Sequence, residues 1–141
     1  MDTIKSNRVV IELHVPDFKK TKAFYKKLGF EVVSEDPIGK ELGYLVMRLG
    51  KTFLNFYGGD SRVYKHTFFK EFPKNTRLGY GVEITIILDD IEGYYKSVFP
   101  KVKNNVVQPL ITKRWGKKDF RLADPFGFYL RFTEPVNWLK S

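Results

Sequence analysis

The chain has 141 residues, a net charge of +9 at pH 7 and no cysteine. This length fits a single domain with its own core, and a hydrophobic content of 43% excludes a disordered chain. The lack of cysteine excludes disulfides, thiolate metal sites and cysteine nucleophiles, and it suits a reducing compartment.

The first half of the chain predicts the order β-α-β-β-β. Residues 9–15 alternate like a strand with one face in a core, with Val9, Ile11, Leu13 and Val15 inward and Val10, Glu12 and His14 outward. A helix should run from Asp17, which suits an N-cap, to a stop at Gly29. Near-helical spacing is shown by Phe18, Ala23, Phe24 and Leu28. Three further strands are predicted at 30–36, 41–49 and 52–57.

The second half predicts the same order again. Asp89 and Asp90 open a predicted helix over 89–102, and strands are predicted at 82–88, 104–111, 118–123 and 128–133. Asp90 follows Asp17 by 73 positions, and Phe132 follows Phe56 by 76. Such nearly constant spacing indicates two copies of one supersecondary unit.

Residues 58–80 join the two halves and hold Phe68, Phe69 and Phe72. Two interpretations are open for this linker. It could contain a short helix that plugs a groove, or its aromatic side chains could pack on the sheet, and we favour the packing.

Three stretches, taken in order, resemble the vicinal oxygen chelate superfamily, which includes glyoxalase I, extradiol dioxygenases and bleomycin-resistance proteins. HVPDFKKTKAFYKKLGFEVV (14–33) is similar to the signature of the first module, and VEITIILDDIEGYY (82–95) to the start of the second. RWGKKDFRLADPFGFYLRFTEP (114–135) resembles the closing segment of the bleomycin-resistance-like branch. The resemblance covers about residues 8–135.

The resemblance implies an α+β fold in which two tandem βαβββ modules form an incurved eight-stranded mixed sheet around a cleft. Residues 1–141 would be one domain, with module one at about 8–57, a linker at about 58–80 and module two at about 81–135. In module two, Ile84, Ile86, Leu88, Leu130 and Phe132 should face the helices. The cleft side should carry Thr85, Ile87, Tyr129 and Arg131. The family resemblance also implies a homodimer.

Enzymes of this superfamily bind a divalent metal through four side chains, and the resemblance places these positions at Val10, Asn55, Glu83 and Arg131. Valine has no donor atom, asparagine offers a neutral oxygen, and arginine brings a permanent positive charge to the site of the cation. Transition metals in catalytic sites need imidazole, carboxylate or thiolate from at least three side chains. We therefore expect no metal and no other cofactor.

Glu83 and Arg131 should meet on neighbouring strands as an ion pair at the vacated metal position, with hydrogen bonds from Asn55, Thr85 or a ligand to offset its desolvation. The pair could equally be structural. Glu12 and His14 share a strand face, which would suit acid–base chemistry, but a structural or polar cleft-lining role is favoured. No catalytic residue is assigned.

The abundance of aromatic residues (16%) suits a flat, partly apolar ligand. Candidate lining residues are Glu12, His14, Tyr44, Phe53, Asn55, Tyr57, Glu83, Thr85, Trp115, Tyr129 and Arg131. Trp115 could cover a dimer seam or stand at the cleft mouth, and the resemblance favours the mouth. Bleomycin is a cationic ligand, so a basic chain favours a neutral or anionic molecule unless Glu12, Glu83 and Asp119 dominate locally.

The leading hypothesis is a metal-free, dimeric protein of the antibiotic-resistance type that sequesters a small, partly aromatic molecule. The alternative is a glyoxalase-like lyase or isomerase, or a dioxygenase-related enzyme, on the same fold. A nucleic-acid partner rests only on the net charge and is not expected. No apolar run approaches the roughly 20 residues of a membrane span, and no signal peptide is visible, so a cytoplasmic protein without a membrane partner is expected.

Overall fold

The computed structural model describes residues 8–39 and 42–139 and divides into two compact units, residues 1–76 and 77–141. Each unit is described by itself. Two predictions fall partly outside the described residues. The third predicted strand begins at Glu41, and residues 1–7 belong to the stretch in which no signal peptide is predicted.

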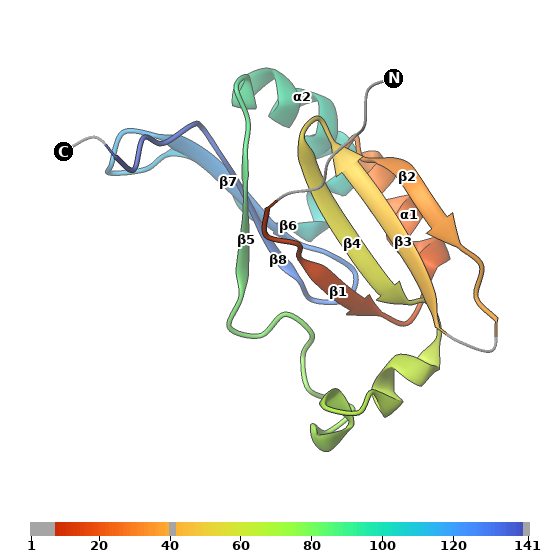
Figure 1. Ribbon diagram of the computed structural model, residues 1–141. Coiled ribbons are helices and arrows are strands. Elements are labelled where there is room, and N and C mark those ends of the chain that lie inside the picture. Colours follow the sequence, from red (N-terminus) through yellow and green to blue (C-terminus); the bar gives the residue numbers. More distant parts are fainter. Residues whose placement is uncertain (1–7, 40–41, 140–141) are drawn as a thin grey trace. The chain divides into compact units, whose positions relative to one another are not determined.

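The first unit holds one helix and four strands in the predicted order (Figure 1). Its sheet has the strand order β1-β4-β3-β2, in which β1 runs parallel to β4 and the other neighbours are antiparallel. Two 3-10 turns, η1 and η2, follow the last strand. The elements are β1 (Glu12–Val15), α1 (Phe18–Lys27), β2 (Glu31–Asp36), β3 (Gly43–Leu49), β4 (Thr52–Gly58), η1 (Ser61–Lys65) and η2 (Phe69–Glu71).

Helix α1 begins and ends where the sequence predicts. The side chain of Asp17 accepts a hydrogen bond from the backbone N–H of Lys20 at 2.9 Å, which satisfies one of the free amides of the first turn. After Leu28, Gly29 adopts φ +89°, a left-handed conformation that costs glycine little and ends the helix. The buried Tyr25 packs its ring 5.1 Å from that of Phe56 and joins helix to sheet.

Two details of the first module differ from the prediction. Strand β1 begins at Glu12 rather than Val9, and Val9 and Val10 are 74% and 51% exposed. Ala23 is exposed on α1, whereas Tyr25 is fully buried, because the helix turns its larger ring rather than its methyl group toward the sheet.

The second unit repeats the arrangement, with the strand order β5-β8-β7-β6 and β5 parallel to β8. Asp90 caps its helix by accepting from the N–H of Gly93 at 3.1 Å, and α2 contacts β6 and β7. The elements are β5 (Glu83–Ile87), α2 (Ile91–Val102), η3 (Lys103–Asn105), β6 (Val106–Thr112), β7 (Lys118–Ala123) and β8 (Tyr129–Thr133).

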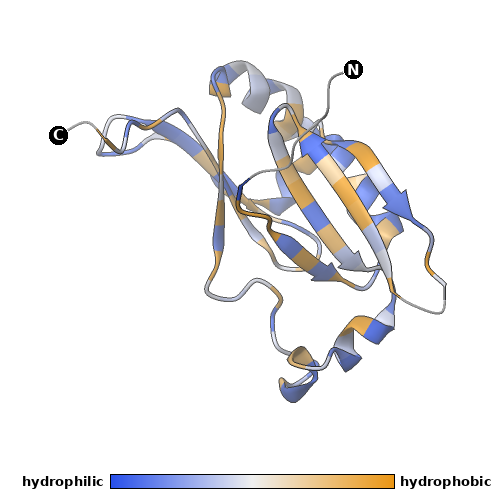
Figure 2. Ribbon diagram, viewed as in Figure 1, coloured by the Kyte–Doolittle hydropathy of each residue, from blue (hydrophilic) through white to orange (hydrophobic). Residues whose placement is uncertain are grey.

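The apolar face of the second sheet forms the core beneath α2. Figure 2 shows hydrophobic and hydrophilic residues alternating along the strands, the pattern on which the face assignment rests. Of the residues predicted to face the helix, Leu88 is half-buried and the others are buried, namely Ile84, Ile86, Leu130 and Phe132. Phe132 stacks on Phe120 with ring centroids 4.8 Å apart, and Tyr95 meets Phe120 from α2 at 4.8 Å.

The turn between β7 and β8 is built around a buried aspartate. Oδ1 of Asp124 accepts hydrogen bonds from the N–H groups of Phe126 and Phe128, both at 2.9 Å. Gly127 has φ +103° and donates its N–H to the carbonyl of Asp124 at 3.1 Å. The Asp-Pro-Phe-Gly sequence therefore sets the hairpin register, as its residue types predict.

Two four-stranded mixed sheets, each with a helix, confirm the predicted α+β class and the repeated βαβββ order. The incurved arrangement of the two sheets around a cleft stays a prediction. Within residues 8–39 and 42–139, no helix has the length and apolar character needed to span a membrane.

Candidate functional site

The outward face of the first sheet carries every candidate that the sequence places in module one. Alternation along β1, β3 and β4 sends these side chains to the side opposite Leu13, Leu45 and Phe56, which are buried. The cross-strand register places Glu12 beside Asn55. The remaining candidates on this face are His14, Tyr44, Phe53 and Tyr57, of which Phe53 is buried and the others half-buried.

His14 lies in a cluster of rings. Its centroid is 4.7 Å from Tyr57, 5.0 Å from His66 and 5.1 Å from Phe69, and its side chain is 16% exposed. Nε2 lies 3.2 Å from the carboxylate of Glu12, whereas Nδ1 is buried with no hydrogen-bond partner among the described residues. Burial lowers the pKa of His14, against the opposing effect of Glu12, so a neutral imidazole is favoured at pH 7.

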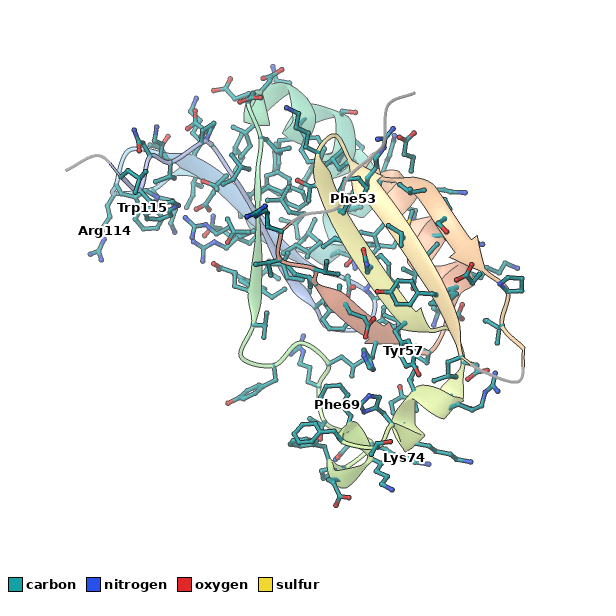
Figure 3. All side chains as sticks on the ribbon, in the orientation of Figure 1. Phe53, Tyr57, Phe69, Lys74, Arg114 and Trp115 are labelled. Carbon is teal, nitrogen blue, oxygen red and sulfur yellow. The ribbon has the colours of Figure 1, made fainter. Side chains whose placement is uncertain are left out.

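The linker supplies part of this cluster, so the predicted packing of its aromatic residues holds only in part. Nδ1 of His66 accepts hydrogen bonds from the N–H groups of Phe68 and Phe69, at 3.1 and 3.2 Å, which fixes the η2 turn over the sheet. Figure 3 labels Tyr57 on the sheet and Phe69 in the linker, the two rings that lie 4.7 and 5.1 Å from that of His14. Phe68 and Phe72 are 62% and 50% exposed, and their rings meet other linker rings, Phe68 with Phe69 at 5.3 Å and with Phe72 at 5.8 Å.

Asn55 and Tyr44 form the second polar contact on this face. Nδ2 of Asn55 donates to the hydroxyl of Tyr44 at 2.9 Å. Burial raises the pKa of Tyr44, the Asn55 hydrogen bond opposes the shift, and the nearby Glu12 carboxylate adds to it. The hydroxyl therefore stays protonated at neutral pH. A contribution of Asn55 to the Glu83–Arg131 pair stays a prediction, because Asn55 belongs to the first unit and the pair to the second.

The outward face of the second sheet carries a set of four charged side chains, Glu83, Asp119, Arg121 and Arg131, which we call the charged tetrad. Nη1 of Arg131 lies 3.5 Å from Oε2 of Glu83, so the predicted ion pair is confirmed. Nε of Arg131 also donates to Oδ2 of Asp119 at 3.2 Å. Arg121 contacts the same two carboxylates, with Nη1 3.5 Å from Glu83 and Nη2 3.4 Å from Asp119.

The tetrad compensates its own charges, two positive and two negative. Asp119 is fully buried, and burial alone would raise its pKa. Hydrogen bonds from Gln108 and Arg121, together with the charges of Arg121 and Arg131, outweigh burial and lower the pKa. Thr85 adds a hydrogen bond to Glu83 at 3.4 Å, which is one of the supports that the sequence predicts.

Asp119 and Arg121 were not predicted to take part in the ion pair. Both lie on β7 two positions apart, so period-two alternation places them on one face, and Arg121 pairs in register with Arg131. That register depends on the hairpin turn, and reading the two residues against β8 would have revealed them.

Cross-strand registers define which positions of the two modules are equivalent. Glu12 pairs with Asn55 as Thr85 pairs with Arg131, and these pairs are separated by the same offsets of 73 and 76 as the repeat. Asn55 and Arg131 are therefore equivalent, and the offset of 73 likewise relates Val10 to Glu83. This agreement supports the four positions at which the family resemblance places metal ligands.

The residues at those four positions do not fit a metal. Val10 has no donor and is 51% exposed, Asn55 offers a neutral oxygen already near Tyr44, and Arg131 is a cation held by two carboxylates. Glu83 is the only anionic donor of the four. Among residues 8–39 and 42–139, no group of three or more His, Asp or Glu side chains is arranged to hold a metal ion.

Trp115 lies on the turn between β6 and β7, next to Arg114 (Figure 3). Its ring is 48% exposed and is approached by two cations, the guanidinium of Arg131 at 5.4 Å and Nζ of Lys113 at 5.5 Å. Nζ of Lys113 donates a hydrogen bond to Oε1 of Gln108 at 3.1 Å, and Nε2 of Gln108 donates one to Oδ1 of Asp119 at 2.6 Å. Trp115 is thus joined to the tetrad, which the sequence analysis did not anticipate.

A pocket of about 470 Å³ opens beside the tetrad, within the second unit. It includes two of the predicted lining residues, Glu83 and Tyr129. The sequence analysis did not single out its other walls, which come from the chain before β5, from β6, and from the ends of β7 and the β7–β8 turn. These residues are Arg77, Gly79, Tyr80, Gly81, Val82, Val107, Ala123 and Gly127.

The candidate residues thus form two sets, one on the outward face of each sheet, and Trp115 joins the second set from the β6–β7 turn. Ligand contact by either set stays a prediction.

Several solved structures are similar to this chain. A hypothetical protein from S. aureus has a TM-score of 0.70 and 22% identity, over 93% of this chain and 95% of that one. A bleomycin resistance determinant encoded on the transposon Tn5 has a TM-score of 0.65 and 22% identity, over 94% and 100%. A bleomycin-binding protein complexed with bleomycin has a TM-score of 0.63 and 21% identity, over 93% and 100%. At these identities the likeness shows the fold.

No curated protein matches the sequence. A model of the Glyoxalase/Bleomycin resistance protein/Dioxygenase superfamily, however, matches residues 7–132. Because this match spans both βαβββ modules, the chain belongs to that superfamily.

Proposed function

We propose that this protein binds a small, partly aromatic molecule without metal chemistry, in the pocket beside Glu83 and Tyr129. The observation that carries the proposal is the combination of an open pocket with a charge-compensated polar wall. A volume of about 470 Å³ is within the range of small-molecule sites, roughly 300–1,000 Å³. Glu83, held by Arg121 and Arg131 at 3.5 Å, gives the pocket a polar group fixed in place.

The apolar walls of the pocket support an aromatic ligand. Tyr80, Val82 and Val107 line the pocket and are 86%, 57% and 60% exposed, so aromatic and apolar surface is available to a ligand there. One of the similar structures is a bleomycin-binding protein in complex with bleomycin, so ligand binding is a known use of this fold. Sequestration in a cytoplasmic homodimer, of the antibiotic-resistance type, completes the proposal.

The absence of a metal step follows from donor chemistry. A cation placed near Arg131 would meet a guanidinium that Glu83 and Asp119 already hold, and Asn55 and Val10 supply no charge to replace them. Elemental analysis of the purified protein should find no stoichiometric transition metal. One metal ion per chain would contradict this part of the proposal.

The pocket can be tested by filling it. Val107→Trp should block the site at little cost to the fold, because Val107 is already 60% exposed. Ile111→Trp is the matched control, on the same strand, 42% exposed and outside the pocket. In a thermal-shift screen of aromatic antibiotics and metabolites, a ligand at 100 times its Kd adds about 2.7 kcal/mol of stability. The added stability should vanish in Val107→Trp and persist in Ile111→Trp, and equal shifts in both would refute the pocket.

A second candidate function, an enzyme on the same fold, is favoured by one observation. His14 has a lowered pKa and lies 3.2 Å from Glu12, the arrangement of a neutral base with an orienting carboxylate. Its ring is 16% exposed beneath Tyr57, His66 and Phe69, which limits access by a substrate. A lyase or isomerase activity that His14→Gln abolishes would establish this function in place of sequestration. Retention of that activity in His14→Gln would remove His14 as its base.

A further inference from the structure

We infer that the ligand of the pocket carries an anionic group, such as a carboxylate on an aromatic ring, and that Arg77 determines this preference. The inference rests on the proposed function, because it concerns the same pocket. It goes further by naming a charge and the residue that reads it.

Two charged residues lie in the pocket wall, Glu83 and Arg77. The carboxylate of Glu83 is compensated by Arg121 and Arg131, each 3.5 Å away. Arg77 forms no ion pair with any residue in the described ranges 8–39 and 42–139. The charge that the pocket presents to a ligand is therefore the positive charge of Arg77.

Arg77 lies beside the β7–β8 turn. A Cβ atom added to Gly127 would lie 3.1 Å from Cγ and 3.3 Å from Nε of Arg77, so this side chain rests against the β7–β8 turn. The same turn is fixed by the side chain of Asp124, which accepts two backbone hydrogen bonds at 2.9 Å. Arg77 is exposed, but its stem packs on this turn, and a packed stem loses less conformational entropy on binding an anion than that of an unpacked surface lysine.

The segment that carries Arg77 packs closely on the same turn. A Cβ added to Gly79 would lie 2.7 Å from Cδ1 and 3.0 Å from Cα of Phe128, so residues 77–79 run directly over the turn that ends in β8. Gly79 has φ +77° and tolerates both this close approach and the left-handed conformation. The sequence around Arg77 is thus shaped to hold it at the pocket.

The apolar walls of the pocket indicate the character of the rest of the ligand. Beyond Arg77, the walls are the exposed Tyr80, Val82 and Val107, which offer apolar and aromatic surface. An aromatic ring against these walls with a carboxylate at Arg77 satisfies both features. The net charge of +9 also favours the approach of an anion over that of a cation.

The experiment compares two ligands of nearly the same shape, 2-naphthoate and 2-naphthamide, by calorimetric titration at low salt. Wild-type protein should bind the carboxylate at least about tenfold more tightly than the amide, the lower limit for one hydrogen bond to a charged group. In Arg77→Gln the two affinities should lie within about twofold of each other. Arg77→Lys should keep part of the preference, since it keeps the charge and loses the planar fork.

Arg114→Gln is the matched control, because it removes the same charge from an exposed turn of the same unit, outside the pocket. The carboxylate preference should survive in this variant, which separates a local contact from net charge. Loss of the preference in Arg114→Gln as well would overturn the assignment to Arg77. An equal affinity of wild-type protein for both ligands, or binding of neither, would overturn the anionic class.

Val107→Trp separates failure of this inference from failure of the proposed function. If both ligands bind wild-type protein equally and neither binds Val107→Trp, the pocket is a ligand site without an anion preference. If 2-naphthoate binds Val107→Trp as it binds wild-type protein, the ligand occupies another place and both proposals fall. Folding of each variant is checked by its thermal midpoint without ligand.

Discussion

Each module has its own capped helix and core and the same strand order, but the outward sheet faces differ at equivalent positions. In register, Tyr44 of module one corresponds to Asp119 of module two, and Asn55 corresponds to Arg131. Asn55 donates to Tyr44 at 2.9 Å, and Arg131 donates to Asp119 at 3.2 Å. The same diagonal contact between neighbouring strands is thus neutral in one module and ionic in the other.

The difference shows what each face needs for stability. In module one His66 and Phe69 lie over His14 and the contact between Asn55 and Tyr44 is neutral, although Arg48 and Glu31 form an ion pair elsewhere on the face. In module two a buried carboxylate, Asp119, requires cations, and two arginines supply them. The two modules therefore repeat each other in their cores but differ in the residues of their outward faces. Substitutions at equivalent positions of the two faces should have unequal effects on stability.

The largest effect is expected for Asp119→Ala. Removing this buried carboxylate leaves Arg121 and Arg131 facing each other with only Glu83 between them. The loss should be about 3 kcal/mol of unfolding free energy, the lower end for a broken buried pair, because both arginines keep 19% exposure. Urea denaturation measures it as a shift in midpoint. Adding Arg131→Met should recover part of the loss, and a further loss would contradict charge compensation.

The corresponding substitution in module one, Tyr44→Phe, should cost less. It removes one neutral hydrogen bond, from Asn55, worth about 0.5–1.5 kcal/mol. Asn55 is half-buried, so water can replace the lost partner. The same denaturation series provides the comparison. A cost equal to that of Asp119→Ala would remove the distinction between the neutral and the ionic contact.

The sequence predicts the shared part of the modules well and the divergent part less well. Caps such as Asp17 and Asp90, and alternation along 82–88 and 128–133, are local features that the residue types determine directly. The Glu83–Arg131 pair is also predicted, from two of the positions that the family resemblance assigns to metal ligands. Arg121 follows only once β7 is read in register with β8, whereas Arg77 could not be predicted, because its place depends on how residues 77–79 cross the β7–β8 turn.

Trp115→Ala should have a smaller effect, confined to module two. The ring faces Arg131 at 5.4 Å and Lys113 at 5.5 Å, and exposed cation–π contacts contribute about 0.5–1 kcal/mol. Trp138→Ala is the control, since that side chain is 84% exposed and makes no ring contact among the described residues. Equal midpoints for the two variants would show that Trp115 adds nothing to the tetrad.

The smallest effect should be a pH dependence confined to module one. Burial lowers the pKa of His14 in the folded chain below its ordinary value of 6.5, although Glu12 opposes part of the shift. Between the folded and unfolded pKa values the unfolded chain binds more protons, so stability rises with pH across this window. The contribution is present in full above pH 6.5 and is lost as pH falls through the folded pKa.

Unfolding free energies at pH 7.5 and 5.5 test this expectation when wild-type protein is compared with His14→Gln. Tyr57, His66 and Phe69 surround the imidazole and Glu12 is its one anionic neighbour among the described residues, so removing the ring removes the proton uptake. Wild-type protein should lose more stability than His14→Gln on acidification. The position equivalent to His14 in module two is Ile87, which cannot titrate. The Ile87→Gln variant should therefore lose as much unfolding free energy on acidification as wild-type protein does. A steeper loss in His14→Gln than in wild-type protein would mean that Glu12 outweighs burial at this site.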